Sequence, residues 1–352
     1  MRKTTKKITV GNITIGGDAP ITVQSMTNTK TEDIKQTISQ IARLKMAGCD
    51  VVRLAVPTME AAKAIGEIKT QTDLPIVADI HFDYRLAIES VHAGADKIRI
   101  NPGNIGDGQK VKAVADACRL YNIPIRIGVN SGSLPKKAIE KYGRPTAEAM
   151  SDSAKEHIAL LHRYDFDDIC LSLKASDVPL TIEAYRLISE ETNYPLHLGV
   201  TEAGTFYNGL VKSSVGIGTL LSEGIGDTIR VSLTDQPEQE VKAGIAILKA
   251  AGLRREGVRM ISCPSCGRCG IDLISLAKDV EARLEAVRDM DITVAVMGCA
   301  VNGPGEARHA DYGIAGGKEQ GILFKKGEIA GKVPYEQLAK ELINMIQHDY
   351  EI

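Results

Sequence analysis

The sequence predicts a (βα)8 TIM barrel followed by a smaller α+β domain, and so a fold of the α/β class. In the first two thirds of the chain, short β-branched apolar runs alternate with longer helical patterns, which is typical of a parallel sheet. Eight such units occupy about 230 residues, close to the size of a closed barrel. A charged segment flanked by glycines, at 252–257, then ends the pattern. We therefore expect a barrel over residues 1–252 and a second domain over residues 258–352, which is long enough to fold independently.

Each predicted barrel strand is a short apolar run that is followed by a segment of helix length. The strands are expected at Ile21–Ser25, Val51–Val56, Pro75–Ile80, Lys97–Asn101, Ile125–Val129, Asp168–Leu173, Leu196–Val200 and Thr228–Leu233. Helices are expected, for example, at Glu32–Ala47, Asp107–Tyr121, Thr146–Tyr164 and Pro237–Ala251. An open doubly wound sheet is the alternative, but no Gly-rich dinucleotide-binding loop follows the first strand. Ile8–Ile15, interrupted by Gly11-Asn12, predicts a hairpin that plugs the barrel floor.

The second domain is predicted to mix helices and strands. Its elements are a helix at Asp272–Val287, an apolar strand at Ile292–Met297, a Gly-rich loop, a hairpin around Lys326-Gly327 and a helix at Tyr335–His348.

Composition narrows the classes of partner. The formal net charge of −2 gives no overall attraction to nucleic acid or to anionic lipid. Aromatic residues make up 4% of the chain and there is no Trp, so little surface is available for stacking bases. No apolar run approaches the ~18 residues of a membrane span, and the basic start lacks the apolar region of a signal peptide. We expect a cytoplasmic protein that binds neither nucleic acid nor membrane.

Polar and cationic residues recur inside the apolar barrel strands, often two positions apart. The pattern comprises Arg53, Asp79 with His81, Arg99 with Asn101, Arg126 with Gly128 and Asn130, Ser172 with Lys174, and Arg230 with Ser232. Residues two apart lie on the same face of a strand, and the outer face must pack on helices. These side chains are therefore expected to point into the barrel or over its rim.

The cations on these strands outnumber their carboxylate partners. Only Asp79 and Glu202 are obvious partners on the same strands. Burying several unpaired cations is costly, and active sites of this fold lie at the carboxyl ends of the strands. We infer an anionic ligand, most simply a phosphate or diphosphate. The alternative is that each cation forms an internal salt bridge that only stabilises the barrel.

Four of the seven cysteines gather in the second domain, at Cys263, Cys266, Cys269 and Cys299. Cys-x-x-Cys spacing with a distant further thiol indicates a metal site. Three interpretations remain open at this point: a structural zinc site, a thioredoxin-like dithiol made of Cys263 and Cys266, and an iron–sulfur cluster. The other three, Cys49, Cys118 and Cys170, have apolar neighbours and are expected to be inert core thiols.

Seven separated motifs extend over almost the whole chain. They are Val-Val-Arg at 51–53, Ala-Asp-Ile-His-Phe-Asp at 78–83, Arg-Ile-Asn-Pro-Gly-Asn at 99–104, Gly-Val-Asn-Ser-Gly-Ser at 128–133, Leu-Gly-Val-Thr-Glu-Ala-Gly at 198–204, Cys-Pro-Ser-Cys-Gly-Arg at 263–268, and Met-Gly-Cys through Gly-Pro-Gly-Glu at 297–306. In these motifs the chain resembles the bacterial 4-hydroxy-3-methylbut-2-enyl diphosphate synthase family (IspG/GcpE), of the methylerythritol phosphate route to isoprenoids.

The resemblance implies an oxidoreductase with a [4Fe–4S] cluster. Its substrate would be 2-C-methyl-D-erythritol 2,4-cyclodiphosphate, opened by a two-electron reduction with loss of water. Reduced flavodoxin or ferredoxin would supply the electrons. The family forms homodimers in which the cluster domain of one chain caps the barrel of the other, so a homodimer is expected here.

The resemblance also implies roles for individual residues. The cluster ligands would be Cys263, Cys266, Cys299 and Glu306. Spacing alone favours Cys269 as the fourth ligand, but the family pattern has no cysteine there, and a carboxylate on iron is more labile than a thiolate. We therefore expect Glu306 to bind iron and to be catalytic, with Cys269 as a nearby thiol.

Within the barrel, the expected substrate-binding residues are those of the strand pattern: Arg53, Arg99, Arg126, Asn130, Lys174, Arg230 and Ser232. Glu202 and His81, the latter oriented by Asp79, are candidates for proton delivery. Two other functions compete with this one. One is a phosphate-binding barrel of the pterin synthase type with a structural zinc domain, and the other is a non-enzymatic iron–sulfur sensor, which would leave the barrel cations without a role.

Overall fold

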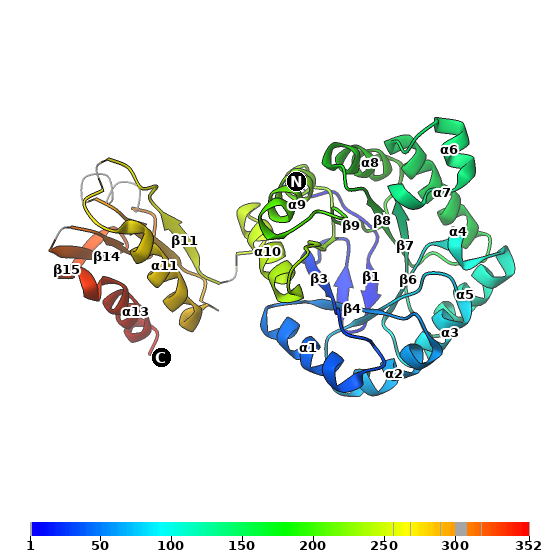
Figure 1. Cartoon of the computed structure of the whole chain (residues 1–352), viewed down its shortest axis with the longest axis horizontal. Coiled ribbons are helices and arrows are strands. Elements are labelled where there is room, and N and C mark those ends of the chain that lie inside the picture. Colours follow the sequence, from blue (N-terminus) through cyan, green and yellow to red (C-terminus); the bar gives the residue numbers. More distant parts are fainter. Residues whose placement is uncertain are drawn as a thin grey trace. The chain divides into compact units, whose positions relative to one another are not determined.

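A computed structural model of the chain describes residues 2–255, 257–267, 269–288, 290–299, 308–317 and 319–351. The chain divides into two compact units, Met1–Arg254 and Arg255–Ile352 (Figure 1). Each unit has its own hydrophobic core. None of the helices formed by the described residues is long and apolar enough to cross a bilayer.

The first unit is a parallel barrel. Within residues 2–255, the eight barrel strands are β3 (Thr22–Met26), β4 (Val51–Ala55), β5 (Ile76–Asp79), β6 (Lys97–Ile100), β7 (Ile125–Asn130), β8 (Ile169–Lys174), β9 (His197–Leu198) and β10 (Thr228–Ile229). They pair in the order β8-β7-β6-β5-β4-β3-β10-β9. A parallel bridge between Leu171 of β8 and Leu196, the residue before β9, joins the two ends of this order. The predicted barrel is therefore confirmed.

The last two barrel strands are shorter than the sequence suggests. β9 and β10 each contain two residues, whereas the apolar runs extend to Val200 and Leu233. Their pairing continues for one further step, because the Arg230 N–H donates to the Leu198 carbonyl at 2.9 Å. Beyond that step the segments that follow β9 and β10 continue as the loops at the rim of the barrel.

Helices surround the barrel, as Figure 1 shows. They are α1 (Ile34–Met46), α2 (Met59–Thr70), α3 (Tyr84–His92), α5 (Gly108–Leu120), α7 (Ala147–His162), α8 (Val178–Glu191), α9 (Phe206–Ser222) and α10 (Pro237–Ala250). The short α4 (Pro102–Ile105), η1 (Ser131–Ser133) and α6 (Lys136–Tyr142) follow β6 and β7. Many of these helices begin with an N-cap residue whose side chain accepts a hydrogen bond from a backbone N–H of the first turn. Examples are Asp33, Thr58, Thr146 and Asp177.

Three aspartates fix the start of neighbouring strands at the barrel floor. Each aspartate stands directly before one strand. Its carboxylate accepts a hydrogen bond from a backbone N–H near the start of the strand that comes before it in the sequence. The pairs are Asp50 with Val23 (2.7 Å), Asp96 with Ile76 (2.7 Å) and Asp227 with Leu196 (2.8 Å). These bonds satisfy backbone donors at the edge of the barrel, where the parallel ladder begins.

The two faces of each barrel strand have opposite character. Outward residues such as Val52, Ile98 and Leu171 belong to the large core cluster between strands and helices. Alternate residues on the inward face are mostly polar. At the barrel floor, a hairpin of β1 (Ile8–Val10) and β2 (Ile13–Ile15) packs against Cys170, so the predicted hairpin is confirmed.

The second unit is a mixed sheet with helices. In its described part the strands are β11 (Arg259–Ser262), β12 (Thr293–Met297), β13 (Tyr312–Ala315), β14 (Gln320–Lys325) and β15 (Glu328–Pro334), in that order. The first three run parallel and the last two are antiparallel to their neighbours. The helices are α11 (Leu273–Leu284), continued by η2 (Glu285–Val287), and α13 (Leu338–Asp349), preceded by η3 (Tyr335–Gln337). Both pack on the sheet in one core.

The two helices, the apolar strand and the hairpin predicted for this unit are present, but two strands were missed. Most of the predicted Gly-rich loop lies outside the described residues. The hairpin turn at Lys326-Gly327 has φ values of 50° and 83°, as a two-residue turn of type I′ requires. β11 and β13, of four residues each, escaped prediction because of their composition. The side chains of β11 are largely accessible, and β13 contains Gly313, so neither shows a clear apolar alternation.

Candidate active site

A cation-lined cavity of about 140 Å³ lies at the carboxyl ends of the barrel strands. It is lined by Arg53, Asp79, His81, Arg99, Arg126, Asn130, Ser172, Lys174, Thr201, Arg230 and Ser232. All seven residues predicted to bind substrate are among them, together with Asp79 and His81. Ser172 belongs to the period-two pattern but is not among the predicted site residues. Thr201, which follows β9, was missed because a lone threonine in a rim loop carries no distinctive signal.

Arg126 of β7 is the clearest sign that this cavity receives an anion. Its side chain is 1% exposed, and none of its three guanidinium nitrogens has a hydrogen-bond partner among the described residues. Burial, and then repulsion from Arg99, lowers its pKa to about 10, so the group stays charged at neutral pH. A buried charge without a partner is costly, and an anion in the cavity would satisfy it.

Asp79 of β5 braces one wall of the cavity. Its carboxylate accepts a hydrogen bond from Arg99 Nη1 at 3.1 Å and lies 3.7 Å from Arg53 Nε. Burial raises the pKa of Asp79, but Arg53 and then Arg99 outweigh it and lower the pKa to about 2. His81 Nε2 lies 4.0 Å away, beyond hydrogen-bond distance, and its side chain is 57% exposed. Asp79 therefore mainly fixes the positions of Arg53 and Arg99, and His81 lies at the solvent-exposed opening of the cavity.

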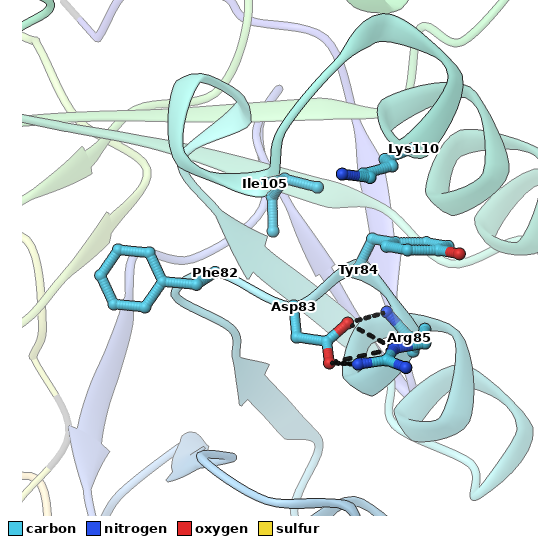
Figure 2. A pocket seen from close by; sticks show the side chains of 6 residues that line it. All are labelled: Phe82, Asp83, Tyr84, Arg85, Ile105 and Lys110. Atoms are coloured by element: carbon cyan, nitrogen blue, oxygen red, sulfur yellow. Dashed lines mark hydrogen bonds and ion pairs between the residues drawn. The ribbon is translucent and has the colours of Figure 1, made fainter.

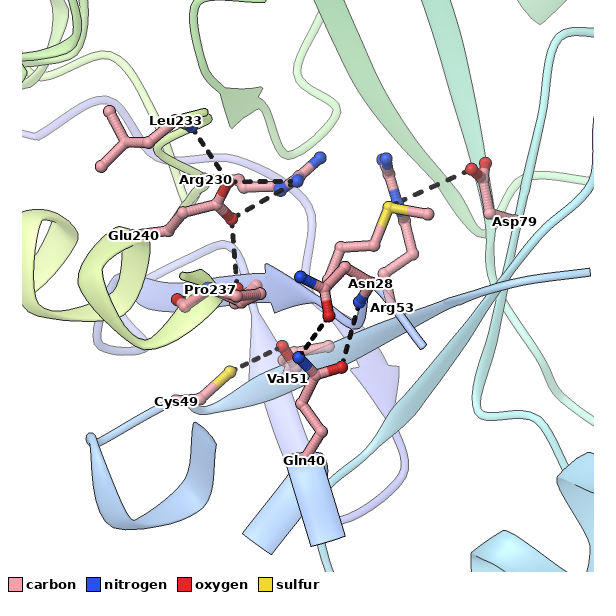
Figure 3. A network of polar contacts seen from close by, with 12 residues as sticks. Asn28, Gln40, Cys49, Val51, Arg53, Asp79, Arg230, Leu233, Pro237 and Glu240 are labelled. Carbon is pink, nitrogen blue, oxygen red and sulfur yellow. Dashed lines mark hydrogen bonds and ion pairs between the residues drawn. The ribbon is translucent and has the colours of Figure 1, made fainter. Parts of the chain in front are cut away.

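The cavity-lining Arg230 has a carboxylate partner that sequence reasoning missed. Glu240 of α10 is buried, and its carboxylate lies 3.3 Å from Arg230 Nη2. Figure 3 shows the two side chains facing each other. The expectation that Glu202 would be the second carboxylate partner is wrong, because Glu202 is exposed on the loop after β9 and does not line the cavity. The backbone of Glu202 has φ 52°, a left-handed conformation that is uncommon outside glycine.

Two glycines make room for the cations. A Cβ on Gly128 of β7 would lie 2.7 Å from Arg99 Nε, and a Cβ on Gly199 would lie 2.7 Å from Lys174 Nζ. Both contacts are closer than real Cβ atoms allow. The missing side chains therefore let Arg99 and Lys174 extend across the barrel. Lys174 is enclosed there, and burial, followed by repulsion from Arg126, lowers its pKa well below the usual value.

Below this cavity, the inward face remains polar. Lys97 of β6 is fully buried, and its Nζ has no hydrogen-bond partner among the described residues. Burial lowers its pKa to about 8. His197 of β9 is also fully buried, and its Nδ1 lies 3.3 Å from Thr228 Oγ1. The sequence pattern places Lys97 at the start of a strand, where polar residues are common, so this lysine does not stand out as a member of the cation set.

A larger pocket of about 350 Å³ lies beside the rim and differs in its charges. Figure 2 shows that it is formed by Phe82, Asp83, Tyr84 and Arg85 with Ile105 and Lys110. Asp83 caps α3 and pairs with Arg85 Nη2 at 2.7 Å. Lys110 Nζ lies 3.8 Å from Asp107. Because its charges are paired, this pocket makes a weaker case for an anion site than the cation-lined cavity.

Two cysteines of the second unit, Cys263 and Cys299, follow the carboxyl ends of neighbouring parallel strands, and Cys266 and Cys269 lie in the loop after the first of these strands. Cys263 follows β11, and its N–H donates to Val296 of β12 at 3.0 Å. Cys299 stands two residues after the end of β12. The Cys269 N–H donates to the Cys266 carbonyl at 2.9 Å, which closes a turn between these two thiols. Cys269 Sγ lies 2.8 Å from where a Cβ on Gly298 would be, next to Cys299.

The spacing of these cysteines is typical of iron–sulfur proteins, in which thiolates of Cys-x-x-Cys pairs hold the cluster. The fourth predicted ligand, Glu306, lies outside the described residues. Among the residues that the structure does describe, no three His, Cys, Asp or Glu side chains are grouped closely enough to hold a metal ion.

The remaining cysteines are buried as expected. Cys49, Cys118 and Cys170 are at most 4% exposed. Burial raises the pKa of all three thiols, that of Cys49 to about 12, so they are protonated and unreactive at neutral pH.

Comparisons with known proteins agree on both units. The chain matches the family model of the GcpE TIM-barrel domain over residues 5–245 and that of the GcpE protein C-terminal domain over residues 259–348. It is 58% identical over 346 residues to the 4-hydroxy-3-methylbut-2-en-1-yl diphosphate synthase (flavodoxin) of Clostridium perfringens, covering 98% of this chain and 99% of the relative. Relatives of the same name from Geobacter sulfurreducens (55%, covering 99% and 98%) and Fusobacterium nucleatum (55%, covering 100% and 99%) are similar.

Among solved structures, the barrel resembles the dihydropteroate synthase of Yersinia pestis, with a TM-score of 0.51 and 14% identity over 71% of this chain and 98% of that protein. The dihydropteroate synthase of Vibrio fischeri gives a TM-score of 0.50 at 17% identity, over 70% and 97%. At such identities these likenesses concern the barrel fold alone.

Proposed function

The chain belongs to the GcpE family, and we propose that it catalyses the reductive ring opening of 2-C-methyl-D-erythritol 2,4-cyclodiphosphate to 4-hydroxy-3-methylbut-2-enyl diphosphate. The reaction takes up two electrons and two protons and releases one water. A carbon–oxygen bond of the ring breaks, so both phosphates stay on the product as a diphosphate. The relatives that bear this name are similar over nearly their full length, which supports the same activity here.

The observation that carries this proposal is the buried guanidinium of Arg126, which has no hydrogen-bond partner in the described part of the chain and lies in a cavity lined by four more cations. We propose that Arg53, Arg99, Arg126, Lys174 and Arg230 bind the cyclic diphosphate. Asn130 and Ser232 lie on the same lining and would bind it as neutral partners. A charge-assisted hydrogen bond contributes about 1.5–3 kcal/mol, so a few of these contacts suffice for tight binding.

The proton donors are proposed to stand at the mouth of the cavity and not among the cations. His81 lines the cavity and is more than half exposed, so it can exchange protons with water and reach a departing oxygen. Glu202 is exposed on the loop after β9, beside the cavity-lining Thr201. Asp79 supports this chemistry indirectly by holding Arg53 and Arg99 in place.

The cluster is proposed to be a [4Fe–4S] centre held by Cys263, Cys266, Cys299 and Glu306. When bound, it would supply the two electrons of the reaction. The three thiols would hold the iron firmly, and the carboxylate of Glu306 would be the labile ligand. We propose that residues 1–252 bind the substrate and that residues 258–352 bind the cluster.

The partners follow from the same family. The names of the relatives specify flavodoxin, so we propose flavodoxin, or ferredoxin with the same role, as electron donor. A homodimer in which the cluster domain of one chain completes the barrel of the other, and a cytoplasmic location, stay predictions. Light scattering and cell fractionation would test them.

The experiment that tests the function is an anaerobic assay with dithionite-reduced methyl viologen as electron source. The expected result is a brown protein with about four irons per chain that forms 4-hydroxy-3-methylbut-2-enyl diphosphate. Mass spectrometry and phosphorus NMR would detect this product. Arg126→Met should lose most of this activity while keeping its iron. A colourless protein that contains zinc and gives no product would refute the proposal and favour a phosphate-binding barrel with a structural zinc domain.

A further inference from the structure

We infer that Glu240 is a positioning residue of the active site, which holds the guanidinium of Arg230 in the orientation that binds the diphosphate. Glu240 lies in the first turn of α10 and is only 5% exposed. Acidic residues are common in the first turn of a helix, where they favour the helix dipole, so its position in the sequence gives no sign of a role in the site. This inference rests on the proposed function.

The carboxylate of Glu240 makes three contacts, one of which is with the cavity-lining Arg230. Oε2 lies 3.3 Å from Arg230 Nη2 and accepts a hydrogen bond from Ser25 of β3 at 3.2 Å. Oε1 accepts the backbone N–H of Leu233 at 3.0 Å. Leu233 directly follows Ser232, a residue of the cavity lining. Figure 3 shows the Glu240 side chain reaching from α10 to Arg230 and to Leu233.

Arg230 needs such a partner because of its surroundings. It lies close enough to Arg53 and Lys174 that its charge lowers the pKa of both, after the larger effect of their burial. Its own Nε is buried and has no hydrogen-bond partner among the described residues. Without Glu240, repulsion from the neighbouring cations would favour rotamers of Arg230 that point away from them. The negative charge of Glu240, attached to a helix, opposes that movement.

The two walls of the cavity are therefore built alike. Asp79 holds Arg53 and Arg99 on one side, and Glu240 holds Arg230 on the other. Each carboxylate is buried and contacts one nitrogen of each arginine, Nε of Arg53, Nη1 of Arg99 and Nη2 of Arg230, so the guanidinium groups keep other nitrogens available for a ligand. Neither carboxylate has to touch the substrate in order to affect its binding.

The direction in which anion affinity changes when Glu240 is neutralised distinguishes a positioning role from a purely electrostatic one. If Glu240 acted only as a nearby negative charge, neutralising it would strengthen the binding of an anion. If it acts by holding Arg230, the same change weakens binding. The test uses the full-length holoenzyme under anaerobic conditions and isothermal titration calorimetry with two probes, 2-C-methyl-D-erythritol 2,4-cyclodiphosphate and inorganic pyrophosphate.

The variants are Glu240→Gln, Arg230→Gln, the double variant, and Glu238→Gln as matched control. Glu238 stands on the same turn of α10 but pairs with Arg43 outside the cavity. We expect Glu240→Gln to weaken the binding of both probes about tenfold. In the Arg230→Gln background the same change should alter affinity by less than about twofold. Glu238→Gln should bind both probes like the wild type.

A purely structural role would lower the melting temperature of Glu240→Gln without this dependence on Arg230. Unchanged or tighter binding in Glu240→Gln, or equal weakening with and without Arg230, would overturn the inference. If Glu240→Gln does not fold, Glu240→Asp replaces it. Because the shorter side chain cannot reach both Arg230 and Leu233, at least threefold weaker binding is expected, and wild-type affinity would overturn the inference.

The two probes distinguish failure of this inference from failure of the proposed function. A wild type that binds pyrophosphate but not the cyclodiphosphate would refute the proposed substrate. Equal pyrophosphate affinity in the wild type and in Glu240→Gln would refute the role of Glu240, whatever the substrate.

Discussion

Gly128→Ala should be one of the most damaging small substitutions in the barrel. Gly128 lies on β7, and its φ is not in the left-handed region, so alanine fits the backbone. The added Cβ would, however, lie 2.7 Å from Nε, 2.8 Å from Nη2 and 3.1 Å from Cζ of Arg99. The buried Arg99 must then withdraw from its position, and its 3.1 Å hydrogen bond to Asp79 is strained or lost.

The expected magnitude follows from these contacts. Overpacking a buried site costs about 1–3 kcal/mol of stability, offset by about 0.4–1 kcal/mol because alanine restricts the unfolded chain. The net loss should be about 1–2 kcal/mol. The affinity for the diphosphate should fall more noticeably than the stability. One charge-assisted contact to the diphosphate contributes about 1.5–3 kcal/mol, which corresponds to about 10- to 150-fold in affinity.

Calorimetry with the cyclodiphosphate and urea unfolding measure the two quantities. Gly331→Ala is the matched control, because it also changes a strand glycine and no heavy atom lies within 4 Å of its added Cβ. The control should bind substrate like the wild type. If Gly128→Ala also bound substrate with wild-type affinity, Arg99 would not contact the diphosphate from its present position, and the assignment of the cavity would have to be revised.

Four further predictions concern charge, cofactor and assembly. Asp79→Asn should lower the free energy of unfolding at pH 7 by about 3–5 kcal/mol, because buried cations lose their carboxylate. Since the pKa of Asp79 is lowered from 3.8 to about 2, roughly 2.5 kcal/mol of that stability depends on its ionisation. This part is complete above pH ~4 and is lost as the pH falls towards 2, as urea titrations at several pH values would show. Lys97→Met should raise the free energy of unfolding at pH 7 by about 3 kcal/mol. The pKa of Lys97 is lowered to about 8, so its charge destabilises the fold below that pH, and the gain should disappear between pH ~8 and ~10.5. Cys269→Ser should keep the iron content and visible spectrum of the wild type, because Glu306 and not Cys269 is the expected fourth ligand. Co-expression of Arg126→Met with Cys263→Ser, each inactive alone, should restore about a quarter of wild-type activity if the site of one chain is completed by the other.

Each of these predictions has a clear contrary result. A stability of Asp79→Asn equal to that of the wild type would mean that the arginines do not depend on this carboxylate. A gain in Lys97→Met that persists above pH ~10.5 would come from packing rather than charge. Loss of iron in Cys269→Ser would make Cys269 a ligand. No activity in the co-expressed pair would place the whole site within one chain.

The sequence by itself determined the fold class and most of the cation set. The pleat of a strand places residues two apart on one face, so the spacing of Arg99 and Asn101, or of Lys174 and Ser172, already indicated an inward polar face. The same rule explains why all seven expected substrate-binding residues line one cavity. The cysteine spacing likewise indicated a metal site, because Cys-x-x-Cys brings two thiols to one point by local geometry alone.

Only the tertiary structure decided which charges are balanced and by what. Glu240 lies on a helix ten residues after Arg230, and the two meet because α10 packs against β3 of the barrel. Glu202 was the expected partner in the sequence, yet its side chain is exposed on the loop after β9. Strand periodicity fixes the direction of a side chain along one element, whereas the pairing of two charges depends on the distance between elements, and that distance is set by packing.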